Sequence, residues 1–164
     1  MFTAVIVERM PPGASRERVT ARLTQLRDVY DGFDIQQTTL SVGPEEFERV
    51  CGDDTSTTLA EVVVTDGAGR HLLVERDDGW HRPETTVSDS EPLVDTVREA
   101  VACRTGLTPR IETLTTATIV AIECEPCDGA AYQLRVQFAA SPDDGEVRDP
   151  AAWRSDSPEM PVVK

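Results

Sequence analysis

Two periods of apolar residues run along the chain and predict its helices and strands. Apolar positions at three- and four-residue steps predict a helix over 15–32, with its first residue as the N-cap. Short β-rich apolar runs predict strands over 2–7 and 34–42, and a second helix is expected to begin at Pro44. The polar stretch 52–58 follows and is interpreted as a linker.

The middle of the chain has the pattern of a β-hairpin followed by a loop. Two apolar, β-rich runs, 59–65 and 71–76, are joined by the turn residues Asp66-Gly67-Ala68-Gly69. The residues 77–90 have neither period, and we expect them to form a loop.

A helix is predicted over 91–105. Ser88 and Glu91 have the spacing of a capping box. Gly106 is the expected C′ residue, with Leu107 as the apolar contact that closes such a helix end. The apolar stripe of this helix consists of Leu93, Val97, Ala100 and Val101.

Beyond this helix, two strands are predicted over 111–124 and 130–140, on either side of a Cys-Glu-Pro-Cys-Asp-Gly turn. Apolar and polar residues alternate strictly from Tyr132 to Phe138, which predicts one buried face and one wet face. The residues 143–145 are a further turn signal, and a tail containing Trp153 follows. The order of these elements indicates an α/β fold with a mixed sheet.

Composition changes the picture mainly through charge. The 164 residues carry 30 acidic and 16 basic side chains, a formal net charge of -14, and Lys164 is the only lysine. Such a surface repels nucleic-acid polymers and anionic membranes. Because the acids are spread along the whole chain, we interpret them as adaptation to high salt in a halophile; the alternative is an acidic patch that binds a cationic protein.

We expect a cytoplasmic protein, because no run approaches the ~20 apolar residues of a membrane span and no signal segment is present. The four cysteines are then expected to be reduced thiols. Cys124-x-x-Cys127 is compatible with a zinc site that Cys51 and Cys103 would complete, but a tight hairpin turn is the preferred interpretation.

The spacing of Trp80, Pro83, Glu91 and Gly106-Leu107, with a hairpin before the helix, resembles the Nudix hydrolases. The signature of that family is Gly, five residues, Glu, seven residues, and Arg-Glu-U-x-Glu-Glu-x-Gly-U, where U is apolar. The resemblance covers about residues 59–153. It implies a Nudix-like α/β/α sandwich with a mixed β-sheet over 58–164, preceded by an N-terminal α/β extension over 1–57.

The positions that hold metal in the family have changed here. In the ungapped alignment the family's arginine is Glu99 and the glutamate after it is Ala100, while the adjacent pair of glutamates is Cys103 and Arg104. Only Glu91 keeps its acidic residue. A shift by one residue would recover Arg98-Glu99, but it still leaves one carboxylate of the three. The catalytic motif is therefore degenerate, and no confident catalytic residue and no magnesium site are expected.

Other side chains near this motif are candidates for binding a ligand without metal. Trp80 could stack on a base or cover the sheet. Guanidinium groups bind phosphates in a bidentate manner, and the four candidates are Arg76, Arg82, Arg98 and Arg104. His81 is a further candidate for a phosphate contact, although a solvated loop histidine is the simpler interpretation.

Three functions follow. The preferred one is a pseudoenzyme: a non-catalytic Nudix-like domain that binds a nucleotide or phosphorylated small molecule, or a protein partner of unknown identity, without a cofactor. The first alternative is an active hydrolase of nucleoside diphosphate-linked substrates that needs Mg²⁺ or Mn²⁺, with metal ligands drawn from Glu91, Glu99, Glu112 or Glu123. The second alternative is a zinc-dependent interaction protein.

Overall fold

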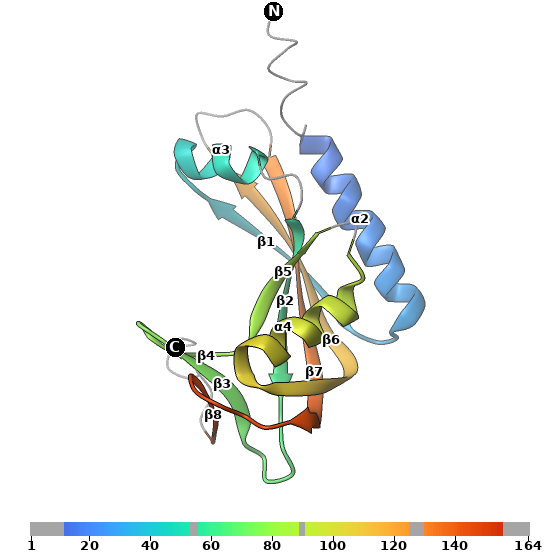
Figure 1. Cartoon of the computed structure of the whole chain (residues 1–164). Coiled ribbons are helices and arrows are strands. Elements are labelled where there is room, and N and C mark those ends of the chain that lie inside the picture. The colour runs from blue at the N-terminus through green and yellow to red at the C-terminus, as the bar shows by residue number, and fades with distance from the viewer. Residues whose placement is uncertain (1–11, 53–55, 89–90, 125–129, 156–164) are drawn as a thin grey trace, which may run out of the picture. The chain divides into compact units, whose positions relative to one another are not determined.

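The structure is a computed structural model that describes residues 12–52, 56–88, 91–124 and 130–155 (Figure 1). Two of the sequence-based predictions lie outside these residues: the strand expected over 2–7, and the position of Cys127. The elements in chain order are α2 (Pro12–Val29), β1 (Asp34–Ser41), α3 (Pro44–Gly52), β2 (Ser56–Val64), β3 (His71–Arg76), β4 (Gly79–His81), β5 (Glu84–Ser88), α4 (Leu93–Thr105), β6 (Leu107–Glu123), β7 (Ala130–Gly145) and β8 (Ala151–Arg154).

The strands form two sheets. One has the order β1-β6-β7-β2-β5, and the other has the order β4-β3-β8. Strand β1 pairs with β6 in parallel, whereas β3 pairs with both β4 and β8 in antiparallel orientation. The predicted fold class, α/β with both kinds of strand pairing, is confirmed.

The chain divides into two compact units. The first comprises Met1–Leu59, Thr86–Glu91 and Thr116–Val136, and the second comprises Ala60–Thr85, Pro92–Thr115 and Gln137–Lys164. The expected N-terminal extension, 1–57, falls in the first unit together with two later segments. The boundary between residues 57 and 58 therefore stays a prediction.

In the first unit, both predicted helices form. Helix α2 buries Val19, Leu23 and Leu26, the three- and four-residue spacing that predicted it. Helix α3 buries Phe47 against one face of the sheet, where Val120 and Ile122 of β6 belong to the same apolar cluster. The alternation of β6 thus gives this helix a continuous apolar surface.

Three boundaries in this region differ from the sequence-based expectation. Helix α2 begins at Pro12 rather than Ser15, because proline is tolerated in a first turn whose N–H groups have no helical acceptor. It ends at Val29, and Gly32 instead supplies a positive φ of 74° to the turn before β1. The predicted linker was wrong for residue 52 and residues 56–58, which belong to α3 and β2.

In the second unit, helix α4 has the predicted C-terminus and buries Leu93, Val97 and Val101 of the predicted stripe, whereas Ala100 is only half-buried. Val97 and Val101 are 0% and 2% exposed. Gly106 has a left-handed φ of 86°, and its N–H donates to the carbonyl of Ala102 at 2.9 Å. The predicted start at residue 91 was two residues early, because Pro92 takes the N-cap position with extended backbone and no side-chain cap.

The capping box forms only in part, within the first unit. The Glu91 carboxylate accepts a hydrogen bond from the N–H of Ser88 at 3.0 Å, and the N–H of Glu91 donates to the Ser88 carbonyl at 3.2 Å. These bonds close a turn rather than cap the helix, which gives Glu91 a structural role.

The predicted hairpin of two paired strands was wrong. Strands β2 and β3 lie in different sheets, and only an isolated bridge between Thr65 and His71 joins them beside the turn. Strand β3 pairs instead with β4 and with β8, which contains Trp153. Turn residues predict that the chain reverses, but the partner of each strand depends on residues far away in sequence.

The remaining differences are strands that the sequence pattern missed or shortened. The predicted loop over 77–90 contains β4 and β5, whose runs of three and five residues are too short for a period to stand out. Strand β7 continues to Gly145 through the expected turn at 143–145, and β6 starts directly after Gly106. Within β7, Leu134, Val136 and Phe138 are 0–2% exposed, as the alternation predicted, whereas Tyr132 is only half-buried.

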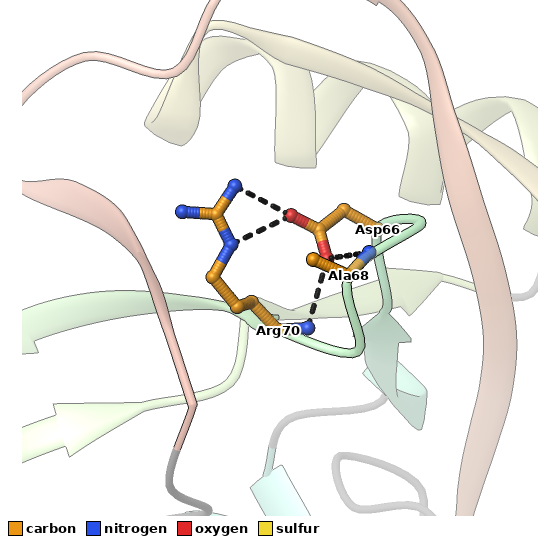
Figure 2. A network of polar contacts seen from close by, with 3 residues as sticks. All are labelled: Asp66, Ala68 and Arg70. Carbon is orange, nitrogen blue, oxygen red and sulfur yellow. Dashed lines mark hydrogen bonds and ion pairs between the residues drawn. The ribbon is translucent and has the colours of Figure 1, made fainter.

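The turn before β3 is held by one aspartate (Figure 2). The Asp66 carboxylate accepts hydrogen bonds from the backbone N–H groups of Ala68 and Arg70 at 3.0 and 2.8 Å, and from Arg70 Nε at 2.9 Å. Burial raises the pKa of Asp66, but the donors from Arg70 and Ala68 favour the charged form more strongly and lower the pKa overall.

This lowered pKa predicts a pH-dependent contribution to stability. A folded-state pKa below the unfolded value of about 3.9 stabilises the protein above that pH, and the contribution is lost as the pH falls through the folded-state value. We expect Asp66→Asn to destabilise the protein at neutral pH, and the difference from the parent to shrink below the unfolded pKa. Urea unfolding of parent and variant across this pH range measures the difference. The control is Asp28→Asn, a change at an exposed residue of α2. An unchanged difference at low pH would contradict the assignment.

Candidate functional site

Helix α4 presents the positions of the degenerate motif on its solvent side. Glu99, Cys103 and Arg104 are exposed and Ala100 is half-buried, while Val97 and Val101 on the other side are buried. This side of the helix therefore carries a methyl group, a thiol and a guanidinium at the three positions where the resembled family has carboxylates.

Arg104 and Arg76 converge on one residue of β5. Arg104 Nη1 donates a hydrogen bond to the Glu84 carbonyl, and Arg76 Nη1 lies 4.0 Å from the Glu84 carboxylate. The side chains of Arg76 and Glu84 are 45% and 37% exposed, so solvent screens this ion pair and a ligand can compete with it. Arg76, Glu84 and Arg104 thus form one cluster, which we call the Glu84 site.

The other two candidate arginines hold the second unit together. Arg82 Nη1 lies 3.6 Å from the carboxylate of Glu61, which also accepts a hydrogen bond from the Gln137 amide at 2.9 Å. Arg98 Nε donates to the Pro109 carbonyl at 3.0 Å, and its guanidinium lies 3.4 Å from Asp143. These contacts occupy Arg82 and Arg98 within the fold.

Trp80 is separated from Arg76 by the register of its strand. Trp80 pairs with Glu75 and Gly79 pairs with Arg76, so the Trp80 and Arg76 side chains leave opposite faces of the three-stranded sheet. The guanidinium of Arg154 lies over the Trp80 ring, 4.6 Å from its centroid. The structure therefore does not bring Trp80 into the Glu84 site.

His81 is engaged with a neighbouring carboxylate. Its Nε2 lies 2.6 Å from Asp78 Oδ1, and the hydrogen bond from His81 lowers the pKa of Asp78. This contact is local to the β3–β4 turn and gives His81 a partner other than a phosphate.

The donor set on α4 does not suit Mg²⁺. That ion requires hard oxygen ligands in octahedral geometry, whereas Ala100 has no donor, Cys103 offers a soft sulfur and Arg104 a permanent positive charge. Among the described residues, no three His, Cys, Asp or Glu side chains are grouped so that they could hold a metal ion.

The acidic residues named as alternative ligands are divided between the two units. Glu91 and Glu123 belong to the first unit, and Glu99 and Glu112 belong to the second. Glu112 accepts a hydrogen bond from the Ser141 hydroxyl at 2.8 Å. Of the cysteines, Cys103 is an exposed free thiol and Cys124 a buried one.

Sequence reasoning missed one contact of the Glu84 site and one contact of Trp80. The acceptor for Arg104 is a backbone carbonyl on β5, and the cation over Trp80 comes from β8. A backbone carbonyl leaves no side-chain signal. The alternation of Trp153 and Arg154 in the tail could have indicated a strand, but four residues are too few to show a period.

No helix within the described ranges is long and apolar enough to cross a membrane.

No protein-family model and no curated protein matches this chain. A NUDIX hydrolase from Nitrosomonas europaea is 21% identical, with 66% of this chain and 77% of that chain covered and a TM-score of 0.45. An ADP-ribose pyrophosphatase from Streptococcus suis is 14% identical, with 62% and 75% covered and a TM-score of 0.44. A MutT mutator protein from Bacillus halodurans is 18% identical, with 59% and 67% covered and a TM-score of 0.45.

Proposed function

We propose that this chain is a Nudix-like protein without catalytic activity, which binds a nucleotide or another phosphorylated small molecule at the Glu84 site without metal. The observation that carries the proposal is Arg104. It is exposed on α4 at a position where the resembled family has a metal-binding glutamate, and it points its guanidinium at Glu84 beside Arg76.

The chemistry of this pair favours an anion over a cation. Arginine stays protonated at every physiological pH, so Arg104 brings a permanent positive charge to the face of α4. The guanidinium of Arg76, which lies beside the Glu84 carboxylate, is a second positive charge at the site. A phosphate that replaces this carboxylate would accept charge-assisted hydrogen bonds from the two guanidinium groups.

Glu84 is the internal competitor in this arrangement. Its carboxylate occupies Arg76 in the absence of ligand, and its negative charge repels an incoming phosphate. A change to glutamine keeps the size of the side chain and removes the charge. Glu84 therefore tests the site in the opposite direction from the two arginines.

The binding experiment uses ADP-ribose as the probe, titrated by calorimetry into the full chain in the presence of a chelator. We expect Arg76→Gln and Arg104→Gln each to weaken binding by about 10-fold or more, the usual contribution of a hydrogen bond to a charged group. Glu84→Gln should tighten it several-fold, and Arg110→Gln, an exposed arginine on β6, should leave it unchanged. Equal effects of the Arg76 and Arg110 changes would overturn the site.

A turnover assay distinguishes this proposal from the active-hydrolase alternative. ADP-ribose, dinucleotides and nucleoside triphosphates are incubated with Mg²⁺ or Mn²⁺ at high salt. We expect no turnover above the background of the Glu91→Gln variant, because removal of single catalytic groups already costs orders of magnitude in rate. Robust turnover that Glu91→Gln or Glu99→Gln abolishes would establish the alternative.

A further inference from the structure

The first unit contains a groove of about 500 Å³ that is not part of the Glu84 site. Its wall is α2, through Arg16 and Thr20, and its floor is formed by β1, β6 and β7. A volume of this size lies within the range of about 300–1,000 Å³ that is typical of small-molecule sites.

The register of β1 and β6 explains why the groove is open. Gln37 pairs with Ile119 and Thr39 with Ala121, so these side chains share the face of the sheet that lines the groove. The opposite face of β6 is filled by the cluster around Phe47. On the groove side, Ala121 contributes only a methyl group, and the space above it is left to polar side chains.

Two opposite charges line this groove without neutralising each other. The Arg16 guanidinium lies over the Tyr132 ring, 5.8 Å from its centroid, and the Glu123 side chain is exposed. Within the described part of the chain, no ion pair joins Arg16 to Glu123 or joins either of them to another residue. Both charges are thus available to a ligand.

The composition of the chain makes this arrangement informative. The chain has 30 acidic and 16 basic residues, and yet no carboxylate of the described residues pairs with Arg16, whose guanidinium lies over an aromatic ring. Its five N–H donors can therefore serve a carboxylate that comes from outside the chain. The carboxylate of Glu123 in the same groove disfavours a phosphate dianion through repulsion and favours an ammonium group.

We propose that this groove binds a zwitterion of the amino-acid class, either a free amino acid or a short peptide. The carboxylate of the ligand pairs with Arg16, and its ammonium group pairs with Glu123. The hydroxyls of Thr20 and Thr39 and the amide of Gln37 hydrogen-bond the remaining polar atoms. The Ile119 side chain and the Tyr132 ring contact its apolar part.

The first experiment is a thermal-unfolding screen of the full chain with the standard free amino acids and with di- and tripeptides of alanine and glutamine. A ligand that binds only the folded state raises the unfolding temperature as its concentration increases. We expect a shift with at least one zwitterion beyond that of sodium chloride at equal ionic strength. Shifts with free amino acids or only with peptides identify the source, and no shift with any of them overturns the proposal.

The second experiment assigns the two charges by calorimetry with the best zwitterion and its two blocked forms. Acetylation removes the ammonium group and amidation removes the carboxylate. Arg16→Gln should weaken binding of the zwitterion by about 10-fold or more but leave binding of the amidated form unchanged. Glu123→Gln should weaken binding of the zwitterion by a similar factor but leave binding of the acetylated form unchanged.

Matched controls exclude a general charge effect. Arg27→Gln on α2 and Glu45→Gln on α3 change the same charges at exposed positions outside the groove, and both should bind like the parent. Circular dichroism of all four variants checks that they fold. If Arg16→Gln weakens the zwitterion and its amidated form equally, or acts no more strongly than Arg27→Gln, the assignment is wrong.

Discussion

Replacing Gly106 with alanine is expected to destabilise the protein by about 2–5 kcal/mol, through left-handed backbone strain and overpacking. Gly106 has a φ of 86°, a backbone conformation that is strained for any residue with a Cβ atom. A Cβ at this position would lie 2.3 Å from the backbone carbonyl oxygen of Glu146. Because backbone cannot rotate away as a flexible side chain can, the end of α4 and the residues after β7 would have to move apart.

Two other glycines separate these contributions. Gly69 has a φ of 83° but no atom within 4 Å of an added Cβ, and Gly67 has open space without a positive φ. We therefore expect Gly69→Ala to cost about 1–2 kcal/mol, the strain alone, and Gly67→Ala to be near neutral. Urea unfolding of the three variants measures the differences. Equal losses for Gly106→Ala and Gly69→Ala would mean that the close approach to Glu146 does not exist.

Restoring glutamate at Ala100, Cys103 and Arg104 together is expected to create a site for Mn²⁺. These residues lie three and four positions apart or adjacent at the solvent side of α4, so three carboxylates there converge on one face. Oxygen ligands grouped in this way bind hard divalent cations. Because the replaced side chains are exposed or half-buried, the fold should persist, with a small loss from the Arg104 hydrogen bond to Glu84.

Calorimetric titration with Mn²⁺ compares the triple variant with the parent, and we expect a gain of at least about 10-fold in affinity from charge-assisted contacts. The control is Arg27→Glu with Arg110→Glu, which adds the same four negative charges at exposed positions on other elements. A folded triple variant that binds Mn²⁺ no better than this control would show that α4 does not present these positions together. The alignment with the Nudix motif would then have to be abandoned.

The candidate site was predictable from sequence only in part. The exposure of Cys103 on α4 follows from the stripe of Val97 and Val101, since helical spacing places it on the opposite side. The exposure of Arg104 did not follow, because a residue seven positions after Val97 lies on the same side of a helix. The contact of Arg104 with Glu84 could not be predicted from the sequence, because the acceptor is a backbone carbonyl on strand β5. The separation of Trp80 from Arg76 depends on a one-residue register that sequence does not specify.

Local patterns alone determined the elements whose cause lies within a few residues. Helix α4 ends where Gly106 permits a left-handed backbone, β7 buries every second residue from Leu134 to Ala140, and Asp66 closes its turn with donors two and four residues away. Each of these depends on contacts of short sequence separation, so the chain carries the information in one window.

The tertiary structure alone decided the pairing of strands and the partners of charged groups. The sequence pattern indicates that β3 is a strand, but its neighbours are β4 and β8 rather than β2. Every strand has the same backbone N–H and C=O groups along its edges, so the pattern does not specify which strands pair. Arg98 contacts Pro109 and Asp143, whereas Arg16 has no carboxylate partner within the described ranges and lies over the Tyr132 ring. Strand pairing and the partners of charged side chains depend on which groups, distant in sequence, are brought within hydrogen-bonding distance by packing. The type of a side chain does not specify which groups these are.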